Sequence, residues 1–94
     1  MQGNTKVLVH APESKLFWVH TGPALRNLVD LRDILPGLKE SIFKFHVNES
    51  KNDFANWIGE VLGEVDLANK LQKIKSKRYT VKALNTYLLD TFGM

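Results

Sequence analysis

The chain contains no cysteine among its 94 residues. A disulfide framework, a zinc site built from cysteine and a cysteine nucleophile are therefore excluded. No apolar run approaches the roughly 20 residues that a membrane-spanning helix needs. The first residues also lack the apolar segment of a signal peptide. We therefore expect a cytoplasmic protein without a membrane partner.

Motifs of catalysis and metal binding are missing as well. The sequence has no G-x-S-x-G segment, no Gly-rich phosphate loop and no H-E-x-x-H pair. Its three histidines, His10, His20 and His46, fall on different predicted elements, so we expect no metal site. We predict that the protein is not an enzyme and that it uses no cofactor.

The residues that are present have the composition of an ordinary folded domain. Apolar residues make up 44% of the chain and charged residues 24%, which is not the balance of a disordered chain. A chain of this length has room for one modest core. We expect one domain over residues 1–94, with an extended arm or β-ribbon in residues 1–20 and a helical core in residues 23–92.

Two short runs near the N-terminus are rich in β-branched and aromatic side chains. They are residues 6–10 (KVLVH) and residues 16–20 (LFWVH), and the segment between them has the composition of a hairpin loop. The sequence leaves open whether these runs pair with each other or with another chain. If only one strand forms, we expect the second run, which has more large apolar side chains.

Alternation along the second run separates its side chains into two faces. Phe17 and Val19 should face one side, and Trp18 and His20 the other. One of these faces should pack on the helices, because a two-stranded ribbon is marginal by itself. We expect Trp18 in the core because of the large area that an indole buries. An exposed Trp18 would instead be a candidate binding hot spot.

Apolar residues spaced three and four apart then predict five short helices. The first should begin near Pro23, which suits a first helical turn, and end at Pro36-Gly37. The second is predicted over residues 38–47. Each of these two helices supplies one apolar stripe to the core.

The third predicted helix is the centre of the fold. Asn52 can cap it and Asp53 favours its first turn, while Gly63 suits its end. Its apolar stripe consists of Phe54, Trp57, Ile58, Val61 and Leu62.

Two further helices are predicted after Gly63. Asp66 can cap the fourth, and residues 76–79 separate it from the fifth. Thr80 can cap the fifth helix, with Tyr79 and Leu84 placed as a hydrophobic staple. The predicted fold is mostly α, a bundle of four or five short helices with a short N-terminal ribbon or strand. Its core should consist of Trp57, Phe54, Phe43, Leu28 and Leu71.

A pattern of uncommon residues at fixed spacing resembles a known family. The pattern comprises Phe43, His46-Val47, Asn52-Asp53-Phe54, Trp57-Ile58 and Leu67-Ala68, preceded by Gly22, Asn27, Leu28 and Leu31. It is similar to that of a small domain family of unknown function found in bacteria and archaea. The resemblance covers roughly residues 17–74 and implies a compact, mostly helical fold. It implies no activity.

His46 and Asp53 allow two interpretations. They could form a histidine–carboxylate pair across the loop, which would be a pH-active group. Alternatively, His46 bonds the loop backbone while Asn52 and Asp53 serve the helix start. We favour the second interpretation, because capping explains short polar side chains at a helix start.

Positive charge is concentrated near the C-terminus. The net charge is +3, and residues 67–89 hold six cations and no acid: Lys70, Lys73, Lys75, Lys77, Arg78 and Lys82. Three of them, Lys70, Lys73 and Lys77, should share one stripe of the fourth helix. They could contact nucleic-acid phosphates or an acidic partner. A solvated helix face is the simpler explanation, because no nucleic-acid-binding motif accompanies the charge.

These observations favour a protein-interaction module without enzymatic activity, acting alone or within a larger assembly. The alternative is a nucleic-acid-binding helical domain that uses the basic residues 70–82. The sequence does not identify the partner or the oligomeric state.

Overall fold

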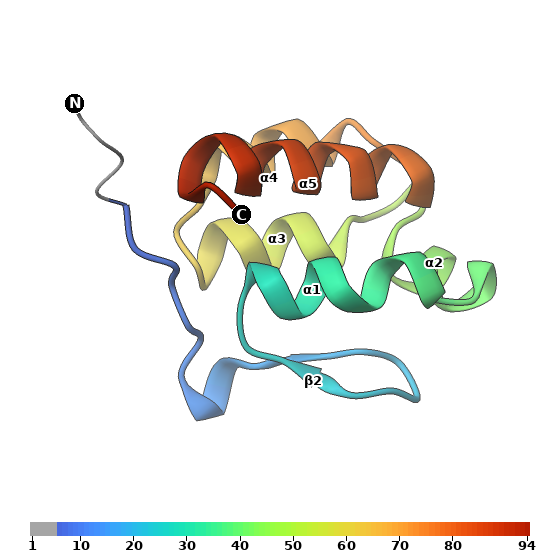
Figure 1. The fold of residues 1–94 in the computed structure, drawn as a ribbon. Helices are drawn as coiled ribbons and strands as arrows, with labels where there is room; N and C mark the ends of the chain where they lie inside the picture. Colours follow the sequence, from blue (N-terminus) through green and yellow to red (C-terminus); the bar gives the residue numbers. More distant parts are fainter. Residues whose placement is uncertain (1–5) are drawn as a thin grey trace.

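Five α-helices and one antiparallel hairpin make up residues 6–94, which the computed structural model describes (Figure 1). The hairpin pairs β1 (Phe17–Trp18) with β2 (Ala24–Leu25). The helices are α1 (Leu28–Ile34), α2 (Glu40–His46), α3 (Asp53–Glu60), α4 (Val65–Gln72) and α5 (Lys77–Phe92). Single 3-10 turns occupy Glu13–Lys15 and Leu35–Gly37. The predicted class, mostly helical with a short N-terminal ribbon, is confirmed.

The hairpin has a different partner from the one predicted. Residues 6–10 contain no strand, and β1 turns back at Thr21-Gly22 to pair with β2. Two backbone bonds close the turn, from Val19 N–H to Pro23 C=O (3.0 Å) and from Gly22 N–H to Val19 C=O (2.9 Å). The turn also places Thr21 at φ 56°. The first five residues of the predicted arm lie outside the described residues.

Asn27, not Pro23, starts the first helix. Its side chain accepts a hydrogen bond from Asp30 N–H (2.9 Å), so α1 begins at Leu28. Pro23 lies in the hairpin turn. The side-chain cap of Asn27 determines the helix start, because proline is only tolerated in a first helical turn, whereas a cap forms a hydrogen bond there. The predicted end is confirmed, since α1 gives way to the 3-10 turn that contains Pro36 and Gly37. The second helix is shorter than predicted.

Two of the predicted caps are wrong, and one is confirmed. Asn52 accepts from Ala55 N–H (3.0 Å) and caps α3. Asp66 lies inside the first turn of α4, which begins after Glu64. Ser76 caps α5 through Tyr79 N–H (3.1 Å). Thr80 is therefore a buried residue of the first turn, and the predicted staple does not form around it.

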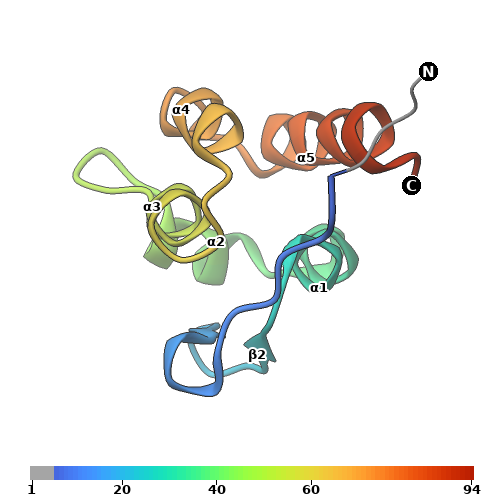
Figure 2. The ribbon, with the colours of Figure 1, turned by 90° about the vertical axis from the view of Figure 1, so that its left-hand side faces the viewer.

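The helices pack around the predicted core. Phe54, Phe43, Leu28 and Leu71 are at most 1% exposed, and Trp57 is 7% exposed. Seen along their axes, α1, α3, α4 and α5 run side by side (Figure 2). Helices α3 and α4 approach closely at Gly59, where a Cβ would lie 3.1 Å from the Cβ of Ala68.

The hairpin packs one face on the helices. Phe17 and Val19 are buried, and the Phe17 ring stacks on Phe54 with ring centroids 4.8 Å apart. Trp18 is 69% exposed, so the prediction that it lies in the core is wrong. Alternation along a strand sends neighbouring side chains to opposite faces, and burying Phe17 turns Trp18 outward.

Candidate interaction surface

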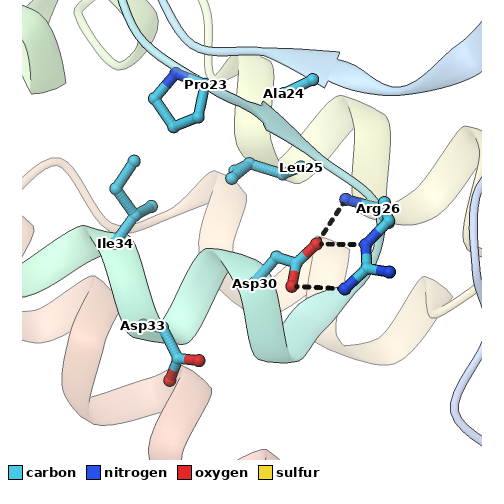
Figure 3. A pocket seen from close by; sticks show the side chains of 7 residues that line it. All are labelled: Pro23, Ala24, Leu25, Arg26, Asp30, Asp33 and Ile34. Carbon is cyan, nitrogen blue, oxygen red and sulfur yellow. Dashed lines mark hydrogen bonds and ion pairs between the residues drawn. The ribbon is translucent and has the colours of Figure 1, made fainter.

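An open groove of about 490 Å³ lies between β2 and α1 (Figure 3). The strand side supplies one wall and the helix side the other. Its lining residues are Pro23, Ala24, Leu25, Arg26, Asp30, Asp33 and Ile34. The hairpin turn creates this groove, because it brings residues 23–26 back alongside the helix that Asn27 starts.

Arg26 and Asp30 close one end of the groove with a bidentate ion pair. Arg26 Nε lies 3.0 Å from Asp30 Oδ2 and Nη2 lies 3.3 Å from Oδ1, while the Arg26 backbone N–H also donates to Oδ2 (2.9 Å). The hydrogen bonds from the Arg26 side chain hold the pKa of Asp30 below its usual value, although burial opposes them. Asp30 is therefore ionised, and Arg26 already occupies both of its oxygens.

Asp33 lies further along the same wall. Its carboxylate is 65% exposed and lies 3.2 Å from the Arg32 guanidinium. An exposed pair of this kind is weak and exchanges readily with solvent. Asp33 is therefore the acidic group of the groove that a bound molecule can reach.

The outer edge of β2 faces this groove. Because Val19 N–H donates to Pro23 C=O, the alternation of an antiparallel ladder turns the Ala24 N–H and C=O away from β1. The N–H and C=O of Arg26 also point away from β1, but both are occupied. The N–H donates to Asp30 Oδ2, and the C=O accepts from Ala11 N–H (2.7 Å). Within residues 6–94, the Ala24 N–H and C=O are the part of this edge without a hydrogen-bond partner.

Trp18 lies directly across the hairpin from Ala24. The two residues are paired in the β1–β2 ladder. Because hydrogen-bonded and non-hydrogen-bonded pairs alternate along an antiparallel ladder, Trp18 and Ala24 form a pair without hydrogen bonds between them. Side chains of such a pair lie close together on one face of the ribbon. Trp18, which is exposed, is therefore a cross-strand neighbour of Ala24, one of the residues that line the groove.

The structure brings His46 and Asp53 together. His46 Nδ1 lies 3.0 Å from Asp53 Oδ2, and Nε2 accepts the backbone N–H of His20 (3.0 Å). The neutral ring therefore carries its proton on Nδ1 and donates to Asp53. The prediction that His46 bonds the loop backbone is wrong, because the hairpin backbone takes that place. Both ring nitrogens are occupied and the ring is 4% exposed, so His46 ties the hairpin to α3.

The other two histidines lie elsewhere. The His20 ring stacks on Phe45 with centroids 3.9 Å apart, and His10 Nδ1 lies 2.9 Å from Asn27 Nδ2. Across residues 6–94, the structure groups no three His, Cys, Asp or Glu side chains in a way that could hold a metal ion.

The six C-terminal cations do not form one helical stripe. Helix α4 ends at Gln72, so Lys70 and Lys77 belong to different helices. Lys77 is half-buried, and its Nζ donates to Leu38 C=O (2.6 Å) and Pro36 C=O (3.3 Å). It therefore holds the 3-10 turn against α5.

The other five cations are exposed, and none of them forms an ion pair with an acid of residues 6–94. They are Lys70, Lys73, Lys75, Arg78 and Lys82. The Arg78 guanidinium lies 6.0 Å from the ring of Tyr79, which is itself 57% exposed. These cations line the turn between α4 and α5 and the start of α5.

One buried polar cluster gave no signal in the sequence. Glu64 is 2% exposed, and its Oε1 accepts hydrogen bonds from Lys6 Nζ and from the Tyr87 hydroxyl. Lys6 Nζ also lies 3.0 Å from the Tyr87 oxygen. The three residues are 23 to 81 positions apart, beyond the reach of any local pattern. The cluster fastens the N-terminal segment to α4 and α5.

The comparisons with known proteins give one match. The model of a family of unknown function, DUF5752, matches residues 7–93. No curated protein and no solved structure matches the chain. Among the helices of residues 6–94, none has the length and apolar character to cross a membrane.

Proposed function

The chain belongs to this family of unknown function, and we propose that it is a non-enzymatic module that binds a partner protein through the outer face of its hairpin. One observation carries the proposal. The Trp18 indole is 69% exposed, although the residues on either side of it, Phe17 and Val19, are buried. The indole is thus presented to solvent on a backbone that is fixed to the core.

This arrangement has the physical features of a binding anchor. Tryptophan is enriched among the residues that dominate binding energy, because it combines a large apolar area with one polar donor. A side chain on a packed strand also loses less freedom on binding than one on a mobile loop. Ala24 and the groove beside it extend the surface that a partner bound at Trp18 can contact.

A capture experiment tests the role of Trp18. Immobilised wild type, Trp18→Ala and Tyr79→Ala are exposed to a nuclease-treated extract of the native host, and retained proteins are identified by mass spectrometry. Tyr79 is the matched control, an exposed aromatic residue on α5. We expect a specific protein to be retained by wild type and Tyr79→Ala and to be missing from Trp18→Ala, as for a hot spot worth about 2 kcal/mol. Equal retention by all three would contradict the proposal.

A second candidate function is nucleic-acid binding by the α4–α5 corner. Its specific support is the set of five exposed cations that are not paired with an acid in residues 6–94. Arg78 and Lys82 are one helical turn apart, and like charges at this spacing destabilise a helix slightly. An anionic partner would relieve that repulsion. This candidate ranks second because, within residues 6–94, Tyr79 is the one large aromatic side chain exposed beside these cations, and no nucleic-acid-binding motif accompanies them.

Oligonucleotide titration at several salt concentrations tests this second candidate. Replacing Lys73, Lys75 and Arg78 with Gln should reduce the salt dependence of binding by about one unit for each phosphate that is no longer neutralised. Lys77 is left intact, because it holds the 3-10 turn. The matched control replaces Lys15, Lys39 and Lys44, which are also exposed and change the net charge equally. No binding by wild type at low salt would eliminate nucleic acid as the partner.

Three remaining expectations are part of the same proposal and rest on the sequence alone. They are a cytoplasmic location, a bacterial or archaeal source, and independence from cofactors. The interaction that we propose needs none of the chemistry that a cofactor supplies.

A further inference from the structure

We propose that the groove between β2 and α1 binds an extended segment of the partner protein. The segment adds to the free edge of β2 as a third strand and places a basic side chain against Asp33. This inference rests on the proposed function, because it specifies what the hairpin binds. It adds the backbone conformation and the charge of the bound segment.

The main-chain groups at the edge of β2 provide the first argument. Ala24 turns one N–H and one C=O away from β1, and these are the unoccupied donor and acceptor of the edge in residues 6–94. An exposed strand edge is a template for pairing with another extended chain. The occupied groups of Arg26 limit the pairing at one end, and the hairpin turn limits it at the other, where Gly22 N–H already donates to Val19 C=O. The free edge therefore fits a single residue of the segment with two main-chain hydrogen bonds.

The side chains at this edge provide the second argument. The segment residue opposite Ala24 would project on the same face as Ala24 and Trp18. Because Ala24 is small, the Trp18 indole can reach across it and cover that residue. The flanking residues of the segment would point to the other face, where Leu25 and Ile34 form the apolar part of the groove. A segment with alternating side chains therefore finds apolar surface on both faces.

The charge of the groove provides the third argument. Its lining contains two carboxylates and one guanidinium, and that guanidinium is already bound to Asp30. The Asp33 carboxylate is 65% exposed, and Arg32 contacts its Oδ1 but, within residues 6–94, no cation contacts its Oδ2. A lysine or arginine of the segment can reach it. For a phosphate, the groove offers no guanidinium that is not already bound to a carboxylate, since Arg26 is bound to Asp30 and Arg32 to Asp33, so the groove fits a basic protein segment and not a nucleic acid.

Peptide selection followed by amide exchange tests the inference. A displayed random-peptide library is selected on the folded wild-type protein, and the enriched peptides are synthesised with a fluorescent label. We expect alternating apolar residues with one lysine or arginine. Bound peptide should slow hydrogen exchange of the Ala24 amide, measured by NMR, by about tenfold or more, because that amide becomes hydrogen-bonded. This measurement needs no substitution in the protein.

Three variants locate the peptide. Ala24→Pro removes the outward N–H at an edge position that tolerates proline, and it should weaken peptide binding by about fivefold. Asp33→Lys should weaken binding by a similar factor, about fivefold. Asp90→Lys is the matched control, with the same charge change on an exposed residue of another helix. It should leave the affinity unchanged.

The outcomes separate this inference from the proposed function. An enriched peptide that neither protects the Ala24 amide nor responds to Ala24→Pro and Asp33→Lys would overturn strand addition. So would a selection that enriches no peptide. If binding of such a peptide were still weakened by Trp18→Ala, the hairpin face would remain the binding site, but the peptide would bind there without pairing to the edge of β2. Conversely, protection of Ala24 without any effect of Trp18→Ala in the capture experiment would overturn the role of Trp18 alone.

Discussion

Trp57 joins the hairpin side of the molecule to the helices through both its ring and its nitrogen. The ring is 7% exposed and lies edge-on to Phe17, and Nε1–H donates to Lys15 C=O (2.8 Å). Trp57→Ala should lower the free energy of unfolding by about 3–5 kcal/mol, because it opens a large cavity. Urea denaturation measures this decrease.

A phenylalanine at the same position separates packing from hydrogen bonding. Trp57→Phe keeps a ring in the core but removes the donor to Lys15, and it should be the milder variant. A decrease below about 1 kcal/mol for Trp57→Ala would show that this site is not packed as the structure has it.

Asn52 does more than cap a helix. Its Oδ1 accepts from Ala55 N–H, and its Nδ2 donates to Leu71 C=O (2.9 Å) at the end of α4. Asn52→Ala should therefore cost the cap, about 1 kcal/mol, and also the hydrogen bond to Leu71 C=O, about 1 kcal/mol, because that carbonyl keeps its bond from Ile74 N–H (2.9 Å). Asn52→Ser restores the cap but is too short to reach Leu71. Chemical denaturation should rank the variants wild type, Ser and Ala in falling stability. Equal stability of Ser and wild type would remove any role for the bond to Leu71.

At the scale of the elements, the turn between α3 and α4 depends on backbone conformation. Gly63 has φ +72°, and nothing lies within 4 Å of where its Cβ would be. Gly63→Ala should therefore cost about 1–2 kcal/mol through the left-handed backbone alone. Gly37→Ala is the control, because its Cβ would also meet open space without a positive φ. Thermal unfolding of the pair checks the prediction, and an equal effect of both substitutions would contradict it.

At the scale of the whole molecule, the Lys6–Glu64–Tyr87 cluster should make stability depend on alkaline pH. The hydrogen bond to Glu64 raises the pKa of Lys6 well above its ordinary value, and burial raises the pKa of Tyr87. Both groups hold their protons more tightly in the folded chain than in the unfolded one. Their contribution is therefore complete below the unfolded pKa values of about 10 and is lost as the pH rises through the higher folded values.

A double variant measures this contribution. The urea midpoint of wild type should fall above about pH 10, and it should fall less in Lys6→Gln/Tyr87→Phe, which lacks both titrating groups. Tyr79→Phe is the control, because Tyr79 is exposed and lies outside the cluster. Parallel pH profiles for wild type and the double variant would rule out a stabilising role for the cluster.

Most of the fold could be predicted because its signals are local. The spacing of apolar residues identified the five helices, and all five core residues predicted on those helices are buried, although Trp18 of the hairpin is not. Asn52 was recognised as a cap because its partner, Ala55, is three residues away. The two wrong caps, Asp66 and Thr80, have side chains that can also cap, but the N-caps are Glu64, two positions earlier, and Ser76, four positions earlier.

Only the tertiary structure decided the features that make up the candidate surface. The sequence determined that Phe17 and Trp18 face opposite ways, but which of them is buried depends on the helices that meet the hairpin. The partner of β1 also depended on a turn at Thr21-Gly22, which brings Ala24 alongside Trp18 and opens the groove to α1. Lys77 and Glu64 form hydrogen bonds with residues 23 to 58 positions away. Periodicity and capping act within a few residues, whereas pairing and burial depend on which distant surfaces the folded chain brings together.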